Sequence, residues 1–281
     1  MPDKHTIGRS MSFCATIVGL FMYAASASAQ LRADSASKDV KRLVGDIWSI
    51  WTSPAHVTSS DARGLVAAAA LTGVAATADE RFYRWAADHP DAWPIRILHP
   101  LREAGHLPVY ELGSGQYLLP LSGALYLAGA ASHSRGLRDA GLGCATAHLT
   151  SAGAREIVYL LISRDRPRLS PDDPFRFHVP GIRDWNAHSF FSGHIANSMG
   201  CASFFAHRFH LHAAEPVMYS LVLAIGAGRV LDGRHWLSDT AVGALFGYAT
   251  GRAINARMTA RARGATSSPT PLAISFSIPF N

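Results

Sequence analysis

The stretch GRVLDGRHWLSD, residues 228–239, contains a histidine and an aspartate whose spacing suits acid–base chemistry. His235 and Asp239 are four residues apart, so they share one face if a helix begins here. A carboxylate in this position can accept the proton of one imidazole nitrogen, which fixes the tautomer and leaves the other nitrogen as a nucleophile. Arg229, six residues before His235, can point its guanidinium into the same space. Taken alone, a histidine and an aspartate at this spacing are equally typical of an ordinary pair on a helix surface.

A second stretch, Ser192-Gly193-His194, adds a hydroxyl, an unobstructed backbone N–H and a second imidazole. The residues that follow, IANSMG, predict a helix whose N-terminal amides and dipole favour an anion. The alternative is a serine that caps a helix beside an incidental histidine. The stretch therefore predicts either an anion site or a plain helix cap.

A third stretch, SRDRP at residues 163–167, supplies Arg166, whose planar guanidinium suits the paired oxygens of a phosphate. A surface arginine at a helix end is the common alternative. The three stretches complement one another, because arginines, a serine and helix amides neutralise phosphoryl oxygens while one histidine attacks phosphorus and the other protonates the leaving oxygen. Such a site needs no metal, since the arginines carry the positive charge that Mg²⁺ carries elsewhere.

Apolar stretches rich in Ala, Gly and Leu predict the helices that must position these residues. We expect an amphipathic helix at 38–51 and a long, proline-containing connection at 79–116. Core helices are expected at about 64–78, 117–132, 141–163, 194–206, 215–230 and 237–254. The three stretches then fall at helix ends that lie on one face of an up-down bundle. The fold class is therefore an all-α helical bundle of about six core helices.

The three stretches resemble the signature of the type 2 phosphatidic acid phosphatase (PAP2) superfamily. That signature is Lys-x6-Arg-Pro, then Pro-Ser-Gly-His, then Ser-Arg-x5-His-x3-Asp. Here the parts stand as Tyr159-x6-Arg166-Pro167, Phe191-Ser192-Gly193-His194 and Gly228-Arg229-x5-His235-x3-Asp239. Their order and internal spacings match, and the resemblance covers about residues 117–254. It implies the helical fold of the acid phosphatase–haloperoxidase type.

The resemblance also implies a mechanism, which is metal-independent, uses no cofactor and passes through a phosphohistidine. His235 would be the nucleophile, oriented by Asp239, and His194 would be the general acid. The groups that hold the phosphate would be Arg166, Arg229, Ser192 and the amide of Gly193.

Three positions depart from the family pattern: Tyr159 replaces the lysine, Phe191 the proline and Gly228 the serine. Tyr159 matters most, because a phenol that donates one neutral hydrogen bond replaces a cation. Arg155, one helical turn earlier, can substitute for that cation if its side chain reaches the site. Reduced activity or an altered substrate would follow if it does not.

The first 29 residues are typical of a signal peptide, with Lys4 and Arg9 before an apolar stretch and a small-x-small site, Ala27-Ser28-Ala29, at the end. A membrane anchor or a first buried helix is the alternative. Cys144 and Cys201 lie in apolar stretches without metal-ligand spacing, so we expect buried thiols, with a disulfide between them left open.

Only 16% of the residues are charged, which favours either well-buried soluble helices or membrane spans. The loops opposite the proposed site, SHSRGLRD and HRFHLH, are rich in arginine, as cytoplasmic loops are. We therefore expect an exported, membrane-associated protein whose site faces the periplasm, with a soluble periplasmic protein as the alternative. The formal charge of +6 forms no block interleaved with aromatics, which argues against nucleic acid as a partner.

These inferences divide the chain into a signal peptide (1–29), N-terminal helices with a connection (30–116), a catalytic core (117–254) and a basic or polar tail (255–281). The expected function is hydrolysis of a phosphate monoester or diphosphate, first of all of a lipid. The alternatives are a soluble acid phosphatase of broad specificity, a vanadium-dependent haloperoxidase and a degenerate protein that binds phosphate or lipid. The expected partners are a lipid phosphate or a small phosphate ester, and a membrane.

Overall fold

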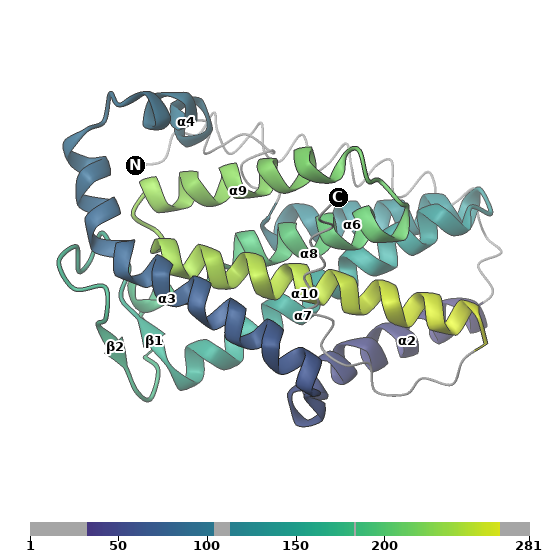
Figure 1. Cartoon of the computed structure of the whole chain (residues 1–281). Coiled ribbons are helices and arrows are strands. Elements are labelled where there is room, and N and C mark those ends of the chain that lie inside the picture. The colour runs from purple at the N-terminus through teal and green to yellow at the C-terminus, as the bar shows by residue number, and fades with distance from the viewer. Residues whose placement is uncertain (1–32, 104–112, 183, 265–281) are drawn as a thin grey trace.

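Eight α-helices hold most of the described residues, which are 33–103, 113–182 and 184–264 of the computed structural model (Figure 1). In chain order they are α2 (Ala33–Thr52), α3 (Ser59–Asp88), α4 (Trp93–Glu103), α6 (Gly115–Ala131), α7 (Arg135–Leu161), α8 (Gly193–Arg208), α9 (Glu215–Leu231) and α10 (Leu237–Ala262). Two short 3-10 helices, η1 (Ser53–His56) and η2 (Trp185–Ala187), and an antiparallel pair of two-residue strands, β1 (Ser163–Arg164) and β2 (Phe177–His178), complete them. The prediction of an all-α fold is confirmed.

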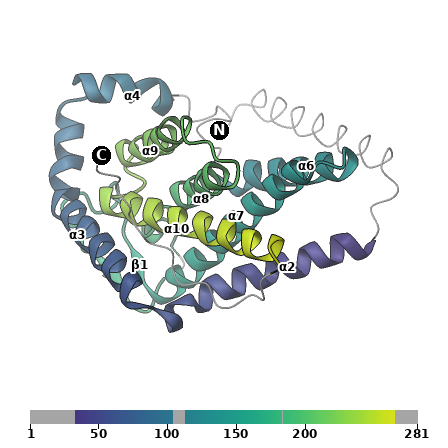
Figure 2. The ribbon, with the colours of Figure 1, turned by 45° about the vertical axis from the view of Figure 1, so that its right-hand side comes forward.

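Helix α8 lies at the centre and packs against α7, α9 and α10, while α2 lies along α7 and α4 lies over α9 (Figure 2). Glycines let α8 and α10 come together backbone against backbone. Gly243, Gly247 and Gly251 recur every fourth residue on α10, and a Cβ on any of them would overlap a backbone carbonyl of α8 or of the residue before it. This close contact fixes the first turn of α10 against the first turn of α8.

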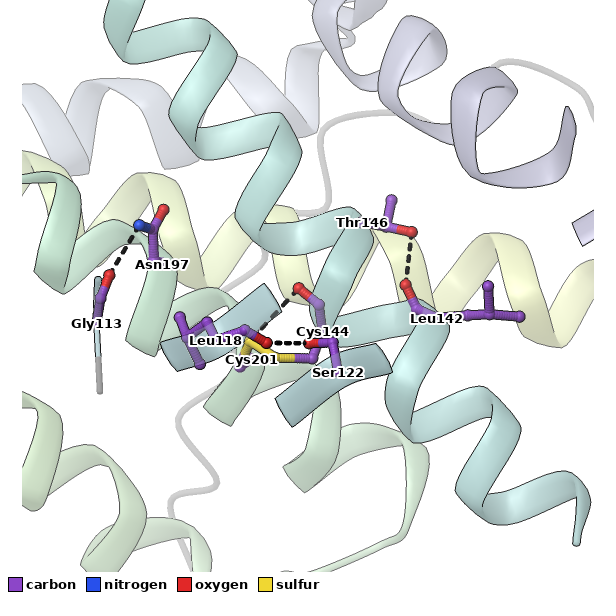
Figure 3. The surroundings of a disulfide bond; sticks show 8 residues. All are labelled: Gly113, Leu118, Ser122, Leu142, Cys144, Thr146, Asn197 and Cys201. Carbon is purple, nitrogen blue, oxygen red and sulfur yellow. Dashed lines mark hydrogen bonds between the residues drawn. A yellow bond between two sulfur atoms is a disulfide. The ribbon is translucent and has the colours of Figure 1, made fainter. Parts of the chain in front are cut away.

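A disulfide between Cys144 of α7 and Cys201 of α8 joins two central helices (Figure 3). Both residues are buried, as expected, but the expectation of free thiols is wrong: the two cysteines form the disulfide that the sequence left open. One turn before Cys201, the amide of Asn197 donates to the carbonyl of Gly113 at 2.9 Å, which ties the chain entering α6 to α8 (Figure 3). The side chains packed around the disulfide are Ile50, Leu118, Ala147, Phe204, Ala253 and Ile254.

The predicted connection at 79–116 is wrong for its described part. Helix α3 continues to Asp88, and α4 occupies residues 93–103. Pro94 is the second residue of α4, where a proline is tolerated because its missing N–H would have no partner inside the helix. Pro94 therefore marks the start of a helix within the predicted connection.

The six predicted core helices are all present, and α10 runs on to Ala262, beyond the predicted end at residue 254. The predicted signal peptide and the tail after Gly264 lie outside the described residues. Among the helices that the structure describes, none has both the length and the apolar character that a membrane crossing demands.

Candidate active site

The three predicted stretches meet at one end of the bundle, where α7 ends, β1 and β2 pair and α10 begins (Figure 1). Hydrogen bonds to backbone carbonyls join them directly. The amide of Ser192 donates to the carbonyl of Asp239 at 3.1 Å, and the indole N–H of Trp236 donates to the carbonyl of Asp165 at 2.8 Å. The predicted convergence is therefore present, and it places the first turns of α8 and α10 side by side.

His235 lies in the turn before α10 and is buried, with 3% of its surface exposed. Its Nδ1 lies 2.7 Å from the backbone carbonyl of Ser189. A carbonyl only accepts, so Nδ1 carries the proton and the lone pair remains on Nε2. Burial, with the charges of Arg229 and Arg166, lowers the pKa of His235 well below its usual 6.5. The imidazole is therefore neutral at neutral pH, as a nucleophile must be.

Asp239 does not receive the hydrogen bond of His235, which corrects the predicted direct pairing. The spacing rule needs both residues inside a helix, but α10 begins at Leu237 and leaves His235 outside it. The carboxylate instead accepts from the amide of Trp236 at 2.8 Å and from the hydroxyl of Ser189 at 2.5 Å. Ser189 therefore connects the two residues: its hydroxyl donates to Asp239, and its carbonyl accepts from Nδ1 of His235.

Arg164 completes the surroundings of Asp239. It is 2% exposed, and its Nη1 donates to the carboxylate at 2.6 Å. Burial raises the pKa of Asp239, and Arg164, the Ser189 hydroxyl and the Trp236 amide act in the opposite direction. Arg164 and Ser189 both lie in or beside the predicted stretches, but the sequence predicts no role for them, because no spacing distinguishes them from neighbouring loop residues.

Arg166 is a buried cation whose donors are incompletely used. Its Nη2 donates to the carbonyl of His188 at 3.4 Å, whereas Nε and Nη1 have no hydrogen-bond partner among the described residues. Its guanidinium lies 4.5 Å from the ring centroid of Trp185. Burial lowers the pKa of Arg166 to about 10, so it stays cationic at neutral pH. A buried cation with unused donors is suited to an anion.

Arg229 belongs to the last turn of α9 and is 3% exposed. Its charge acts on both His235 and Arg166, lowering the pKa of each. The turn between α9 and α10 thus brings this second arginine to the same place as Arg166, as the sequence predicts. Two buried arginines beside a neutral histidine make the site strongly positive.

Ser192 precedes α8 as its N-cap, but its side chain does not cap the helix. The hydroxyl is buried and has no partner in the part of the chain that the structure describes. The plain helix-cap interpretation of this stretch is therefore wrong. Gly193 is the first residue of α8, so its amide belongs to the helix N-terminus, where backbone N–H groups favour an anion. His194, the next residue, lies close enough for its charge to lower the pKa of His235.

Arg155 reaches the site from one turn before Tyr159. A Cβ on Gly193 would overlap its Nη1, so the guanidinium lies directly on the start of α8. Its central carbon is 5.6 Å from the ring centroid of Tyr159. Tyr159 is buried, stacks on His188 with centroids 4.3 Å apart, and has its pKa raised by burial to about 12, so it remains a neutral phenol. The cation at this corner of the site therefore comes from Arg155.

His148 is a buried group that the sequence did not predict. It lies two turns before Arg155 on α7, with 6% of its surface exposed, and its Nδ1 has no partner among the described residues. Burial and the charge of Arg155 lower its pKa to about 4. A lone histidine in an apolar helix carries no sequence signal of burial beside a cation.

Within the described ranges, no group of three or more His, Cys, Asp or Glu residues is arranged to hold a metal ion. The match to known proteins lies in the same part of the chain as the site. The family model of the PAP2 superfamily matches residues 140–263, from α7 to the end of α10. No curated protein and no solved structure matches the chain. Residues 140–263, which hold every predicted site residue, thus match the PAP2 superfamily.

Proposed function

We propose that this protein is a phosphatase that hydrolyses a phosphate monoester or diphosphate through a phosphohistidine intermediate. The match to the PAP2 superfamily supports phosphatase chemistry in general. The observation that carries the proposal is the juxtaposition of neutral His235, its proton held on Nδ1 by Ser189, with the unused donors of Arg166.

In the proposed first step, Nε2 of His235 attacks phosphorus and the bond to the leaving oxygen breaks. His194 gives its proton to that oxygen. Arg166, Arg229, Ser192 and the amide of Gly193 hold the remaining phosphoryl oxygens, whose charge is then met by preorganised donors. In the second step His194 takes a proton from water, the water oxygen attacks phosphorus, and the N–P bond breaks to release phosphate and restore His235.

The test is phosphate release from an aryl phosphate by the wild type, His235→Ala and His56→Ala. His56 is an exposed histidine of η1, far along the chain from the site, and is the matched control. We expect His235→Ala to lose at least about 10³-fold in kcat and His56→Ala to match the wild type. Equal rates in the wild type and His235→Ala would leave only a binding protein.

The intermediate itself has a separate readout. Denaturation during turnover of a substrate with labelled phosphate should leave labelled protein in the wild type and none in His235→Ala. A phosphoramidate is labile in acid and stable in alkali, so the label should be lost only on acid treatment. Label that survives acid would argue for a serine or another nucleophile.

We further propose that the substrate is a lipid phosphate. Exposed apolar side chains lie next to site residues: Leu160 is 63%, Leu161 61% and Trp185 59% exposed. Leu160 and Leu161 directly follow Tyr159 in the chain, and Trp185 lies on the guanidinium of Arg166. An apolar patch beside a phosphate site suits a substrate with an acyl or prenyl chain.

Replacing Leu160 and Leu161 together by Asn tests this substrate class. The value of kcat/KM for a lipid phosphate in mixed micelles should fall about tenfold, because the apolar contact of each exposed leucine with the acyl or prenyl chain of the substrate is lost. The value for a water-soluble aryl phosphate should not change. Equal effects on both substrates, or a preference of the wild type for the soluble ester, would favour a broad-specificity acid phosphatase.

We also propose that the protein acts in the cell envelope, associated with a membrane, with its site on the periplasmic side. The signal-peptide pattern of residues 1–29 and the disulfide support export, since disulfides persist in oxidising compartments. Fractionation of cells expressing the protein should place it with the envelope. Recovery with cytoplasmic markers would contradict the proposal.

A further inference from the structure

Asp79 is a buried carboxylate of α3, in a part of the chain that the family model does not match. Only 1% of its surface is exposed. Its Oδ1 accepts from the amide of Ser238 at 2.8 Å, and its Oδ2 accepts from the hydroxyl of the same serine at 2.6 Å. Ser238 is the second residue of α10. Asp79 therefore accepts a hydrogen bond from one of the amides that have no partner within the helix at its N-terminus.

Asp79 also pairs with Arg164. Nη2 of Arg164 donates to Oδ2 of Asp79 at 2.7 Å, while Nη1 donates to Asp239 at 2.6 Å and to the Ser238 hydroxyl at 2.8 Å. Nε donates to the carbonyl of Pro174 at 2.7 Å. Each nitrogen of the guanidinium is thus held, and the group has a single position between the two carboxylates.

The path from Asp79 ends at the nucleophile. It passes from Asp79 to Arg164, from Arg164 to Asp239, from Asp239 to the hydroxyl of Ser189, and from the carbonyl of Ser189 to Nδ1 of His235. All five residues are buried. A buried ion pair adds little to stability compared with apolar packing, whereas the geometry of this one fixes the carboxylate of Asp239, which accepts from Ser189.

We propose that Asp79 is a positioning residue for the reaction, acting on His235 through Arg164 and Asp239 and on the first turn of α10 through Ser238. The inference rests on the proposed function. It makes α3 part of the working site, although the family segment begins only at residue 140.

The test compares kcat and KM for Asp79→Asn and Asp61→Asn. Asp61 is the matched control: it is a buried carboxylate of the same helix that caps α3 with Thr58. Asp79→Asn should lower kcat by about 10- to 100-fold, the usual effect of a small misplacement of reacting groups. Its KM should stay within about twofold, because Arg166 and Arg229 keep their places. Asp61→Asn should keep the kcat of the wild type.

A coupling measurement separates positioning from a general structural role. In an Asp239→Asn background, Asp79→Asn should lower kcat by less than about twofold, since both residues act along one path. If the two effects multiply, or if Asp79→Asn has the kcat of Asp61→Asn, the inference is wrong.

Ser238→Ala provides the second variant if Asp79→Asn does not fold. It removes one link between Asp79 and Arg164 while leaving every charge paired, and should lower kcat by about three- to tenfold. An unchanged kcat would overturn the inference. Failure of the proposed function and failure of this inference give different results. A wild type no faster than His235→Ala overturns both. A wild type that is active and depends on His235, with Asp79 and Ser238 variants of unchanged kcat, overturns the inference alone.

Discussion

Tyr159 and Arg155 show how a family position can lose its cation while the site keeps one. The neutral phenol of Tyr159 occupies the lysine position and packs on His188, and Arg155 lies over Gly193 from one turn earlier. The ring of Tyr159 thus fills the space at this position, and Arg155 supplies the positive charge beside Gly193.

Arg155→Ala should therefore lower kcat/KM by about 10- to 100-fold, because a hydrogen bond from a cation to phosphate contributes about 1.5–3 kcal/mol. Tyr159→Phe should change it by less than about threefold, since the ring and its packing remain. Arg135→Ala, an exposed arginine at the start of α7, is the control. Steady-state kinetics on one aryl phosphate measure all three. A larger loss in Tyr159→Phe than in Arg155→Ala would reverse the assignment.

The residue types of the site were predictable and their hydrogen bonds were not. Sequence spacing indicated the two arginines, the two histidines and Ser192, because each lies near a helix end whose place can be read from apolar periodicity. The role of Ser189 could not be predicted. The helix predicted from residue 237 already leaves His235 outside it, and no sequence spacing shows which backbone carbonyl meets its Nδ1.

Among the elements, the contact between α8 and α10 is the one that sets the geometry of the site. A Cβ on Gly247 would overlap the carbonyl of Ala196, and Gly243 and Gly251 face α8 in the same way. The N-terminal turns that carry Ser192 and Asp239 stay together only if the two helices remain this close.

Gly247→Ala should destabilise the protein by about 1–3 kcal/mol, because the added methyl forces two backbones apart in a packed interior. Gly73→Ala is the control: Gly73 lies in α3, and no atom lies within 4 Å of the place that an added methyl would take. The better helix propensity of alanine should there leave stability unchanged or raise it by up to about 1 kcal/mol. Urea unfolding followed by circular dichroism measures both. Equal stability of the two variants would mean that α8 and α10 can separate without cost.

The elements that were hardest to predict lie before the family segment. The sequence from Asp79 to Asp88 mixes charged and aromatic residues, and its periodicity was too weak to extend α3 to its real end. Those residues are ordered by long-range partners, such as the ring of Tyr83 against Trp236 and the carboxylate of Asp79 against Arg164. Tertiary contacts of this kind leave no local pattern.

At the scale of the whole molecule, buried neutral histidines link stability to pH. The pKa of His148 is about 4 in the folded chain and about 6.5 when exposed, so the unfolded state binds more protons as the pH falls. Stability is therefore fully present above pH 6.5 and declines as the pH falls from 6.5 towards 4. His235, whose pKa is also lowered, acts in the same direction.

Between pH 7.5 and pH 4.5, the titration of His148 should lower the free energy of unfolding by about 2–3 kcal/mol. His148→Gln should therefore lose less stability than the wild type over this range, whereas His56→Gln should follow the wild type. Chemical unfolding at several pH values gives the comparison. A wild type and His148→Gln with parallel pH profiles would show that His148 titrates normally in the folded protein.

The bond between Cys144 and Cys201 has a practical consequence for anyone who makes this protein. It closes a loop across a sequence separation of 57 residues, and such a link typically adds about 2–4 kcal/mol to stability. Both sulfur atoms lie inside the core, so the oxidant must meet them before the helices finish packing. A preparation from a reducing cytoplasm can then contain two folded populations of identical sequence and different stability, and thiol counting belongs before any kinetic comparison of variants.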